Sequence, residues 1–342
     1  MTTTLSAALH ANVPALLWGA PGTGKSATIA ALAAGRGDHL EVLSGGILAD
    51  PADITGPLAV VDGEARYLRP AWLRRLLSAD TAGNGTILFI DELTCASAQV
   101  QAALLRLVQE RCAGETPLPA ATRIVAAANP ADQAAAGADL PAPTANRWVH
   151  VQWTLQPASW ASWMLAQPDA RPERASVAAY IHAHPAALLR LPGTETERGA
   201  AWPSPRSWDA AARLMAALPA GPDRLEALAC AVGAAAAAEY AAWIRQADLP
   251  DPEDVLAGRA PVPVRADARH AALLAVAAAV LGRLTAPRWA RAWEILGAVA
   301  AEGRDSAVIA AGVLARDKRS KKFPAPPEAA DLAGDLLEVV HG

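Results

Sequence analysis

The sequence is poor in cysteine, lysine and charge of either sign. Its three cysteines are far apart and form no CxxC pair, which argues against both a disulfide framework and a zinc site. Only 19% of the residues are charged, and the net charge is −4, so a basic nucleic-acid-binding surface is not expected. The alanine-rich runs are interrupted by charged residues before they reach the length of a membrane span. Because the N-terminus also lacks the pattern of a secretory signal, we expect a cytoplasmic protein without a membrane segment.

The first half of the sequence alternates short apolar runs with helical segments. The runs lie at residues 15–18, 86–90, 123–128 and 148–151. Such alternation predicts an α/β fold, in which a mostly parallel sheet is flanked by helices.

After about residue 153 the apolar runs stop and long Ala/Leu/Arg segments predict helices. The proline-rich stretch 248–265 is the best candidate for an internal linker, and 318–327 reads as an exposed loop before a short final helix. We therefore expect three parts: an α/β domain at 1–154, a helical domain at 155–250, and a linker with a helical extension at 251–342.

Residues 19–26 read Gly-Ala-Pro-Gly-Thr-Gly-Lys-Ser, a complete GxxxxGK[ST] motif between a predicted strand and a predicted helix. Backbone N–H groups of such a loop and the following helix N-terminus attract phosphate; Lys25 can reach the β- and γ-phosphates, and Ser26 can bind Mg²⁺. The alternative, a glycine-rich turn that binds nothing, does not explain the order of strand, motif and helix. The residues predicted to bind ATP are Gly19, Pro21, Gly22, Thr23, Gly24, Lys25, Ser26 and Ala27.

Two further strands are predicted to end in polar residues that suit phosphoryl transfer. Asp91 and Glu92 follow the run 86–90, where Asp91 could hold Mg²⁺ and Glu92 could polarise the attacking water. A helix N-cap pair is the alternative for these carboxylates. Asn129 ends the run 123–128 and could orient the same water, although Asn-Pro is also common turn chemistry.

Two arginines are candidates for stabilising the charge of the transition state. Arg147 stands just before the run 148–151, where it could reach the nucleotide of a neighbouring subunit. Arg206 begins a helix of the second half and could touch the γ-phosphate in its own subunit. Ordinary surface ion pairs are the alternative for both.

The order and spacing of residues 19–26, Asp91-Glu92, Asn129, Arg147 and Arg206 resemble the Walker A, Walker B, sensor 1, arginine-finger and sensor 2 elements of an AAA+ ATPase. More narrowly, the segments 50–57, 90–94, 100–105 and 203–206 look like the MoxR branch, whose relatives include CbbQ- and NorQ-type activating chaperones.

This resemblance implies a P-loop AAA+ domain followed by an α-helical lid, here with a helical C-terminal extension. It further implies ATP and Mg²⁺ as cofactors and a ring oligomer, expected to be a hexamer, that remodels or activates a client protein. Segments 50–77 and 110–123 would then hold insertions facing the pore or the client, and a von Willebrand factor A protein is the implied partner.

Two other functions remain open from the residues alone. A nucleic-acid motor or loader is one, although the acidic net charge speaks against it. A nucleotide-gated assembly scaffold that hydrolyses little ATP is the other, although it would not need Glu92. We expect no metal beyond Mg²⁺: His182 and His184 are two positions apart, so their rings should diverge on a helix.

Overall fold

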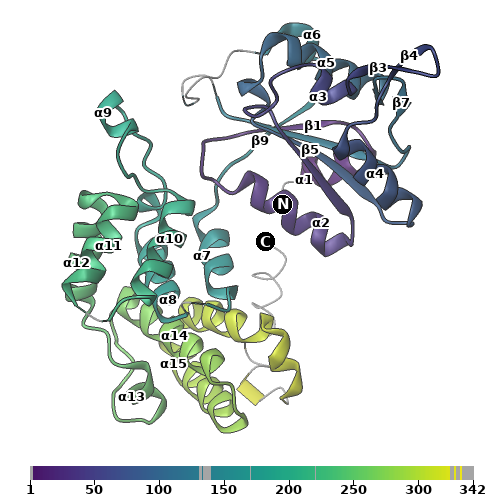
Figure 1. The fold of residues 1–342 in the computed structure, drawn as a ribbon. Helices are drawn as coiled ribbons and strands as arrows, with labels where there is room; N and C mark the ends of the chain where they lie inside the picture. Colours follow the sequence, from purple (N-terminus) through teal and green to yellow (C-terminus); the bar gives the residue numbers. More distant parts are fainter. Residues whose placement is uncertain are drawn as a thin grey trace. The chain divides into compact units, whose positions relative to one another are not determined.

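A five-stranded parallel sheet forms the centre of the first of two units, Met1–Thr154 and Leu155–Gly342, in the computed structural model (Figure 1). The structure describes residues 3–130, 133, 140–169, 171–219, 221–323, 327–328 and 332. The strands are β1 (Ala15–Trp18), β2 (His39–Ser44), β5 (Thr86–Asp91), β8 (Arg123–Ala128) and β9 (Val149–Gln152). Their order is β2-β5-β8-β1-β9, and every pairing is parallel.

Both faces of this sheet are covered, which explains why its inner strands are continuous apolar runs. Neighbouring residues point to opposite faces, so Leu16 packs in one core and Leu17 in the other. The helices on one face are α1 (Thr3–His10) and α2 (Lys25–Arg36); those on the other are α3 (Ala52–Thr55), α4 (Ala71–Thr81) and α5 (Ala98–Glu110). The predicted α/β fold with a parallel sheet flanked by helices is confirmed.

Strand β2 is an edge strand that the sequence pattern did not indicate. Its residue Glu41 interrupts the apolar run, yet the side chain is only 5% exposed. Arg75 of α4 neutralises it with two hydrogen bonds, from Nε to Oε2 at 3.0 Å and from Nη2 to Oε1 at 2.6 Å. The ion pair allows a buried carboxylate in this strand.

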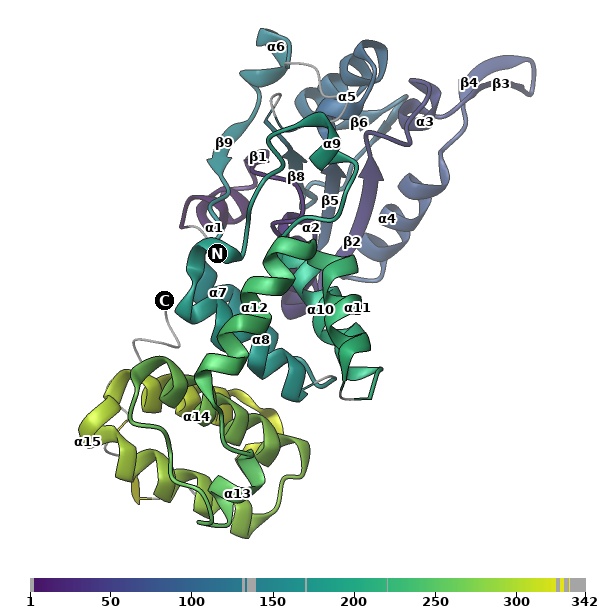
Figure 2. The same ribbon diagram turned by 90° about the vertical axis from the view of Figure 1, so that its left-hand side faces the viewer.

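Two short hairpins lie in the segments 50–77 and 110–123. Strands β3 (Leu58–Val61) and β4 (Glu64–Tyr67) are joined by Asp62 and Gly63, whose φ angles of 53° and 82° suit a type I′ turn. Figure 2 shows this hairpin projecting beyond the sheet of the first unit. The second hairpin pairs β6 (Cys112–Ala113) with β7 (Thr116–Pro117). The other short elements among the described residues of this unit are the 3₁₀ turn η1 (Leu93–Cys95) and α6 (Ala142–Ala145).

The second unit is helical over its described residues, as the sequence predicts. Its elements are α7 (Pro157–Ala166), α8 (Arg171–Ala183), η3 (Pro185–Ala187), α9 (Glu195–Arg198), α10 (Pro205–Ala216), α11 (Pro222–Val232), α12 (Ala234–Ala247), α13 (Pro252–Leu256), α14 (Ala266–Gly282), α15 (Ala286–Arg316) and η4 (Lys318–Lys322). One hydrophobic core runs through α7, α8, α10, α12, α14 and α15. The domain boundary expected at residue 250 stays a prediction.

The expected linker and the expected exposed loop each contain a helical turn. The expected linker, 248–265, includes α13, and the expected loop, 318–327, begins with η4. Most of the region after residue 327, where a short final helix is expected, lies outside the described residues. Within the described part of the chain, no helix combines the length and apolar character needed to cross a membrane.

Helix α15 bends where an arginine from α14 lies against it. Gly303 has non-helical angles, φ −153° and ψ 55°, and a Cβ atom there would lie 2.5 Å from Arg269 Nη1. The guanidinium is almost fully buried and donates to the carbonyls of Glu302 and Val264 at 2.6 Å each. A side chain that binds a free carbonyl inside a helix is a recognised cause of a kink.

Helix α14 also carries a buried histidine that faces a second histidine. The rings of His270 and of His182 on α8 stack with centroids 3.9 Å apart and an interplanar angle of 20°. His270 is 4% exposed, and burial, with a smaller effect of His182, lowers its pKa to about 3. Burial likewise lowers the pKa of His182, against the opposing charge of Asp305. Both rings are therefore neutral in the folded protein near pH 7.

Acid should destabilise the second unit through His270. Below pH 6.5 the unfolded imidazole binds a proton that the folded one, with its pKa of about 3, does not bind, so the unfolding free energy falls as the pH falls from 6.5 towards 3. For this group alone we expect a loss on the order of 2 kcal/mol between pH 7.5 and pH 5. Urea unfolding at the two pH values measures it.

The matched comparison is His270→Phe, which keeps an aromatic ring and removes the titration. Its unfolding free energy should depend less on pH than that of the wild type. An equal pH dependence in wild type and His270→Phe would contradict the assignment.

Candidate functional site

The loop between β1 and α2 has the backbone of a phosphate cradle. Gly22 and Gly24 have φ angles of 75° and 87°, a region that residues with a Cβ atom rarely adopt. The Thr23 hydroxyl donates to the carbonyl of Ala20 at 2.7 Å, which closes the loop on itself. Helix α2 begins at Lys25, directly after Gly24, so its first N–H groups and positive dipole end face the loop.

Lys25 is 7% exposed, and its ammonium joins two strands of the sheet. Nζ donates to the carbonyls of Gly19 at 2.7 Å and Ala20 at 2.9 Å, where β1 runs into the loop. It also donates to Asn129 Oδ1 at 2.9 Å, just beyond the end of β8. The structure thus places Asn129, predicted from a separate segment, directly beside the loop lysine.

Ser26, next to Lys25 in the sequence, contacts Asp91. The Ser26 hydroxyl donates to Asp91 Oδ2 at 2.5 Å, and the second carboxylate oxygen accepts the backbone N–H of Glu92 at 3.0 Å. A hydroxyl and a carboxylate are oxygen ligands of the kind that Mg²⁺ prefers. Nearby negative charge is evident at Cys95, whose thiol pKa is raised by burial and further by Glu92 and Asp91. These residues therefore fit a bound Mg²⁺.

Glu92 stands at the turn that follows β5, with its side chain exposed. Its φ of 53° is in the left-handed region, which turns the chain sharply into η1. Its neighbours are Gly45 and Gly46, which follow the edge strand β2. A Cβ atom at Gly46 would lie 3.1 Å from Glu92 Oε2, and one at Gly45 would collide with the Glu92 carbonyl oxygen. The carboxylate is thus free to meet a water molecule while its backbone is closely packed.

The two predicted arginines belong to different units. Arg147 is half-buried in the turn between α6 and β9, where Nε donates to Gln109 Oε1 at 3.3 Å and Nη1 to the carbonyl of Pro143 at 3.1 Å. Arg206 belongs to the second unit and is exposed in the first turn of α10. That turn is fixed by a capping box between Ser204 and Ser207.

Three residues that the sequence did not indicate shape the loop and its surroundings. Trp153 donates from its indole nitrogen to the carbonyl of Thr23 at 3.2 Å, and Trp18 immediately precedes the loop. Gly45 is required by the close approach of the Glu92 backbone. In the sequence, the Gly-Gly pair at 45–46 would indicate a close approach of two chain segments only if β2 were already recognised as a strand.

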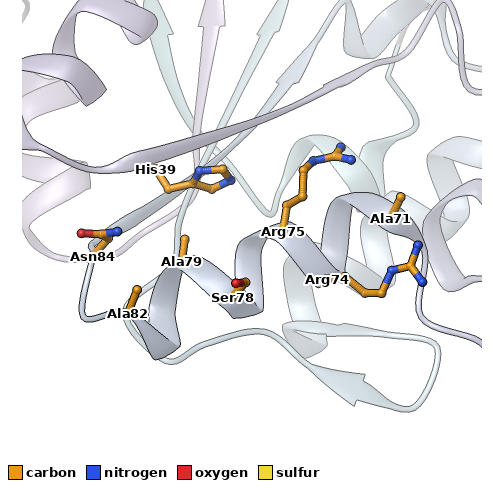
Figure 3. A pocket seen from close by; sticks show the side chains of 8 residues that line it. All are labelled: His39, Ala71, Arg74, Arg75, Ser78, Ala79, Ala82 and Asn84. Atoms are coloured by element: carbon orange, nitrogen blue, oxygen red, sulfur yellow. The ribbon is translucent and has the colours of Figure 1, made fainter.

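A surface hollow of about 580 Å³ lies elsewhere in the first unit, between β2 and α4. Figure 3 shows His39 and Arg75 in the space between the strand and the helix. None of the phosphate-loop residues lines it. Because Arg75 is already paired with Glu41, we assign no anion site there.

Residues 14–148 match the family model of the AAA domain of the dynein-related subfamily. The matched region spans less than half of the chain and lies within the first unit, which has the P-loop AAA+ fold. The second unit lies outside the match. The matched region contains Lys25, Ser26, Asp91 and Asn129, which lie at one edge of the sheet.

Two of the solved structures that match the chain show the level of similarity. A candidate ATPase from Cytophaga hutchinsonii is 16% identical with a TM-score of 0.34, over 96% of this chain and 78% of that one. A point mutant of RuvB from Thermotoga maritima is 16% identical with a TM-score of 0.38, over 83% of this chain and 84% of that one. No curated protein matches the chain.

Substitution of Gly45 should impair the site without touching the phosphate loop. In Gly45→Ala the new methyl group must displace the Glu92 backbone, so ATP turnover should fall about tenfold or more while ATP affinity stays within about twofold. Steady-state ATPase assays and calorimetric titration with ATP measure the two quantities. Gly35→Ala is the matched control, since a Cβ atom there meets nothing within 4 Å. Equal turnover in both variants would show that the close approach is unimportant.

Proposed function

We propose that this protein is a Mg²⁺-dependent ATPase of the MoxR branch, which assembles into a ring and remodels or activates a client protein. The observation that carries the proposal is the cluster of Lys25, Ser26, Asp91 and Asn129 at the carboxyl ends of β1, β5 and β8. Ligands of parallel α/β sheets bind at this edge. Hydrolysis needs a cation for the phosphates, a metal site and an oriented water, and these residue types supply them.

Each residue has a distinct part in the proposed reaction. Lys25 would release its loop carbonyls and bind phosphate oxygens, while Ser26 and Asp91 would hold Mg²⁺, which neutralises the phosphate charge. Glu92 would accept a proton from the attacking water that Asn129 orients. Arg147 would act on the nucleotide of the adjacent subunit, and Arg206 on the γ-phosphate in its own subunit.

The β3–β4 hairpin supports a role in contacting a client. Leu58 is 61% exposed and Val60 is 77% exposed, although both stand in a strand where apolar residues are normally covered. We propose that the client is a protein and that the hairpin contacts it. A von Willebrand factor A protein is the proposed partner.

Glu92→Gln tests the hydrolytic role directly. The amide keeps the size of the side chain but cannot accept the proton, so turnover should fall by about 100-fold or more with ATP binding retained. The ATPase rate and the calorimetric affinity for ATP are measured on the same preparation. Glu226→Gln, at an exposed position of α11, is the control. Unchanged turnover, or loss of ATP binding, would contradict the proposed role of Glu92.

Arg147→Ala tests action across a subunit interface. We expect the variant to assemble as the wild type does and to lose about 1000-fold in turnover, because an arginine finger supplies transition-state stabilisation of that size. Particle mass and ATPase rate are followed together over protein concentration. Arg245→Ala, at an exposed position of α12, is the control. If a wild-type monomer hydrolyses ATP as fast as any assembly, the ring mechanism is wrong.

A further inference from the structure

Strand β9 is attached to the phosphate loop at its carboxyl end. The backbone N–H of Trp153 donates to the carbonyl of Trp18 at 2.7 Å, and the Trp153 indole donates to the carbonyl of Thr23 at 3.2 Å. A Cβ atom on Gly19 would lie 3.0 Å from the Cβ of Trp153, so the start of the loop rests on this residue. A displacement of the loop therefore acts on β9.

His150, in the middle of β9, makes a second connection to the residue before the loop. The indole nitrogen of Trp18 donates to His150 Nδ1 at 2.8 Å, and the two rings are within 8° of parallel. The opposite ring nitrogen, Nε2, lies 2.8 Å from the carbonyl oxygen of Ala145. Because an indole nitrogen only donates and a carbonyl only accepts, the bonds assign a neutral imidazole with its proton on Nε2.

The carbonyl that His150 holds belongs to the turn that carries Arg147. Ala145 is the last residue of α6, and its carbonyl oxygen also accepts the backbone N–H of Trp148 at 3.3 Å. The N–H of Arg147 donates to the carbonyl of Thr144 at 3.2 Å in the same turn. The imidazole thus joins Trp18, next to Gly19, to the backbone two residues before Arg147.

Packing does not explain the presence of a histidine at this position. His150 is exposed, and the backbone pairing of β1 with β9 needs no side chain. A histidine contributes two directed hydrogen bonds here, because its rigid ring carries an acceptor on one side and a donor on the other.

We propose that His150 is a positioning residue that couples the phosphate loop to the Arg147 turn of the same subunit. Nucleotide in the loop would move Trp18, and the imidazole would carry that movement to the turn whose arginine serves the adjacent subunit. The inference rests on the proposed function, because it requires Arg147 to act across an interface. Through this coupling, nucleotide bound in one subunit would regulate ATP hydrolysis in the adjacent subunit.

His150→Phe, which keeps an aromatic ring and loses both hydrogen bonds, tests the coupling in the full-length protein. ATP affinity should stay within about twofold and the particle mass should be unchanged. Turnover should fall about tenfold or more, since misplacing a catalytic group by about 1 Å can reduce turnover by about 100-fold. His150→Gln should recover part of the turnover, because its amide nitrogen can still donate to the Ala145 carbonyl. His10→Phe is the matched control.

A double-mutant cycle with Arg147→Ala separates positioning from general damage. If His150 acts through Arg147, adding His150→Phe to Arg147→Ala causes no further loss of turnover. Additive losses overturn the inference, as does weakened ATP binding in His150→Phe. Trp18→Phe, which removes only the hydrogen bond to Nδ1 of His150, is a second test in case His150→Phe does not assemble. This substitution, too, should cause no further loss of turnover when it is added to Arg147→Ala.

The cycle also distinguishes this inference from the function on which it rests. If Arg147→Ala assembles and turns over like the wild type, the finger assignment fails and the coupling falls with it. If Arg147→Ala is defective and His150→Phe behaves as the wild type, only the coupling is wrong.

Discussion

The buried ammonium of Lys25 sets the arrangement of the first unit. A cation that is 7% exposed needs oxygen partners, since burial without them costs several kcal/mol. Its partners come from the end of β1 and from Asn129 after β8, so these two chain segments must meet at one point. In the strand order β5 lies next to β8, which places Asp91 within reach of Ser26. The order of strands and the charge of one lysine thus fix the site together.

The parts of this site that could be predicted from the sequence are those whose signals are local. The phosphate loop is a contiguous motif, and Asp91 and Asn129 each end an apolar run. Strand β2 could not be recognised because Glu41 interrupts its pattern and the compensating Arg75 is 34 residues away. The role of Gly45 was hidden for the same reason, since its neighbour Glu92 is on another strand and only the folded sheet brings them together.

The helical unit shows the same limit. Alanine-rich periodicity predicts helices but leaves their contacts undetermined, because many helix faces are equally apolar. Helix α14 is buried on nearly all sides, and the specific features of its packing are polar. Arg269 lies at the bend of α15 and His270 stacks on α8, each in a place that an apolar pattern would not single out. These polar contacts distinguish one packing of similar helices from others.

The geometry around Arg147 makes its position sensitive to small forces. The described contacts of its guanidinium are two bonds of 3.3 and 3.1 Å, and α6 before it has only four residues. A hydrogen bond contributes about 1 kcal/mol net, while coupling between sites typically amounts to about 1–3 kcal/mol. The two bonds of His150 are therefore of the right magnitude to bias this turn. A more rigid turn would hold the arginine in one place whatever the state of the loop, and a turn without the imidazole would receive no signal from β1.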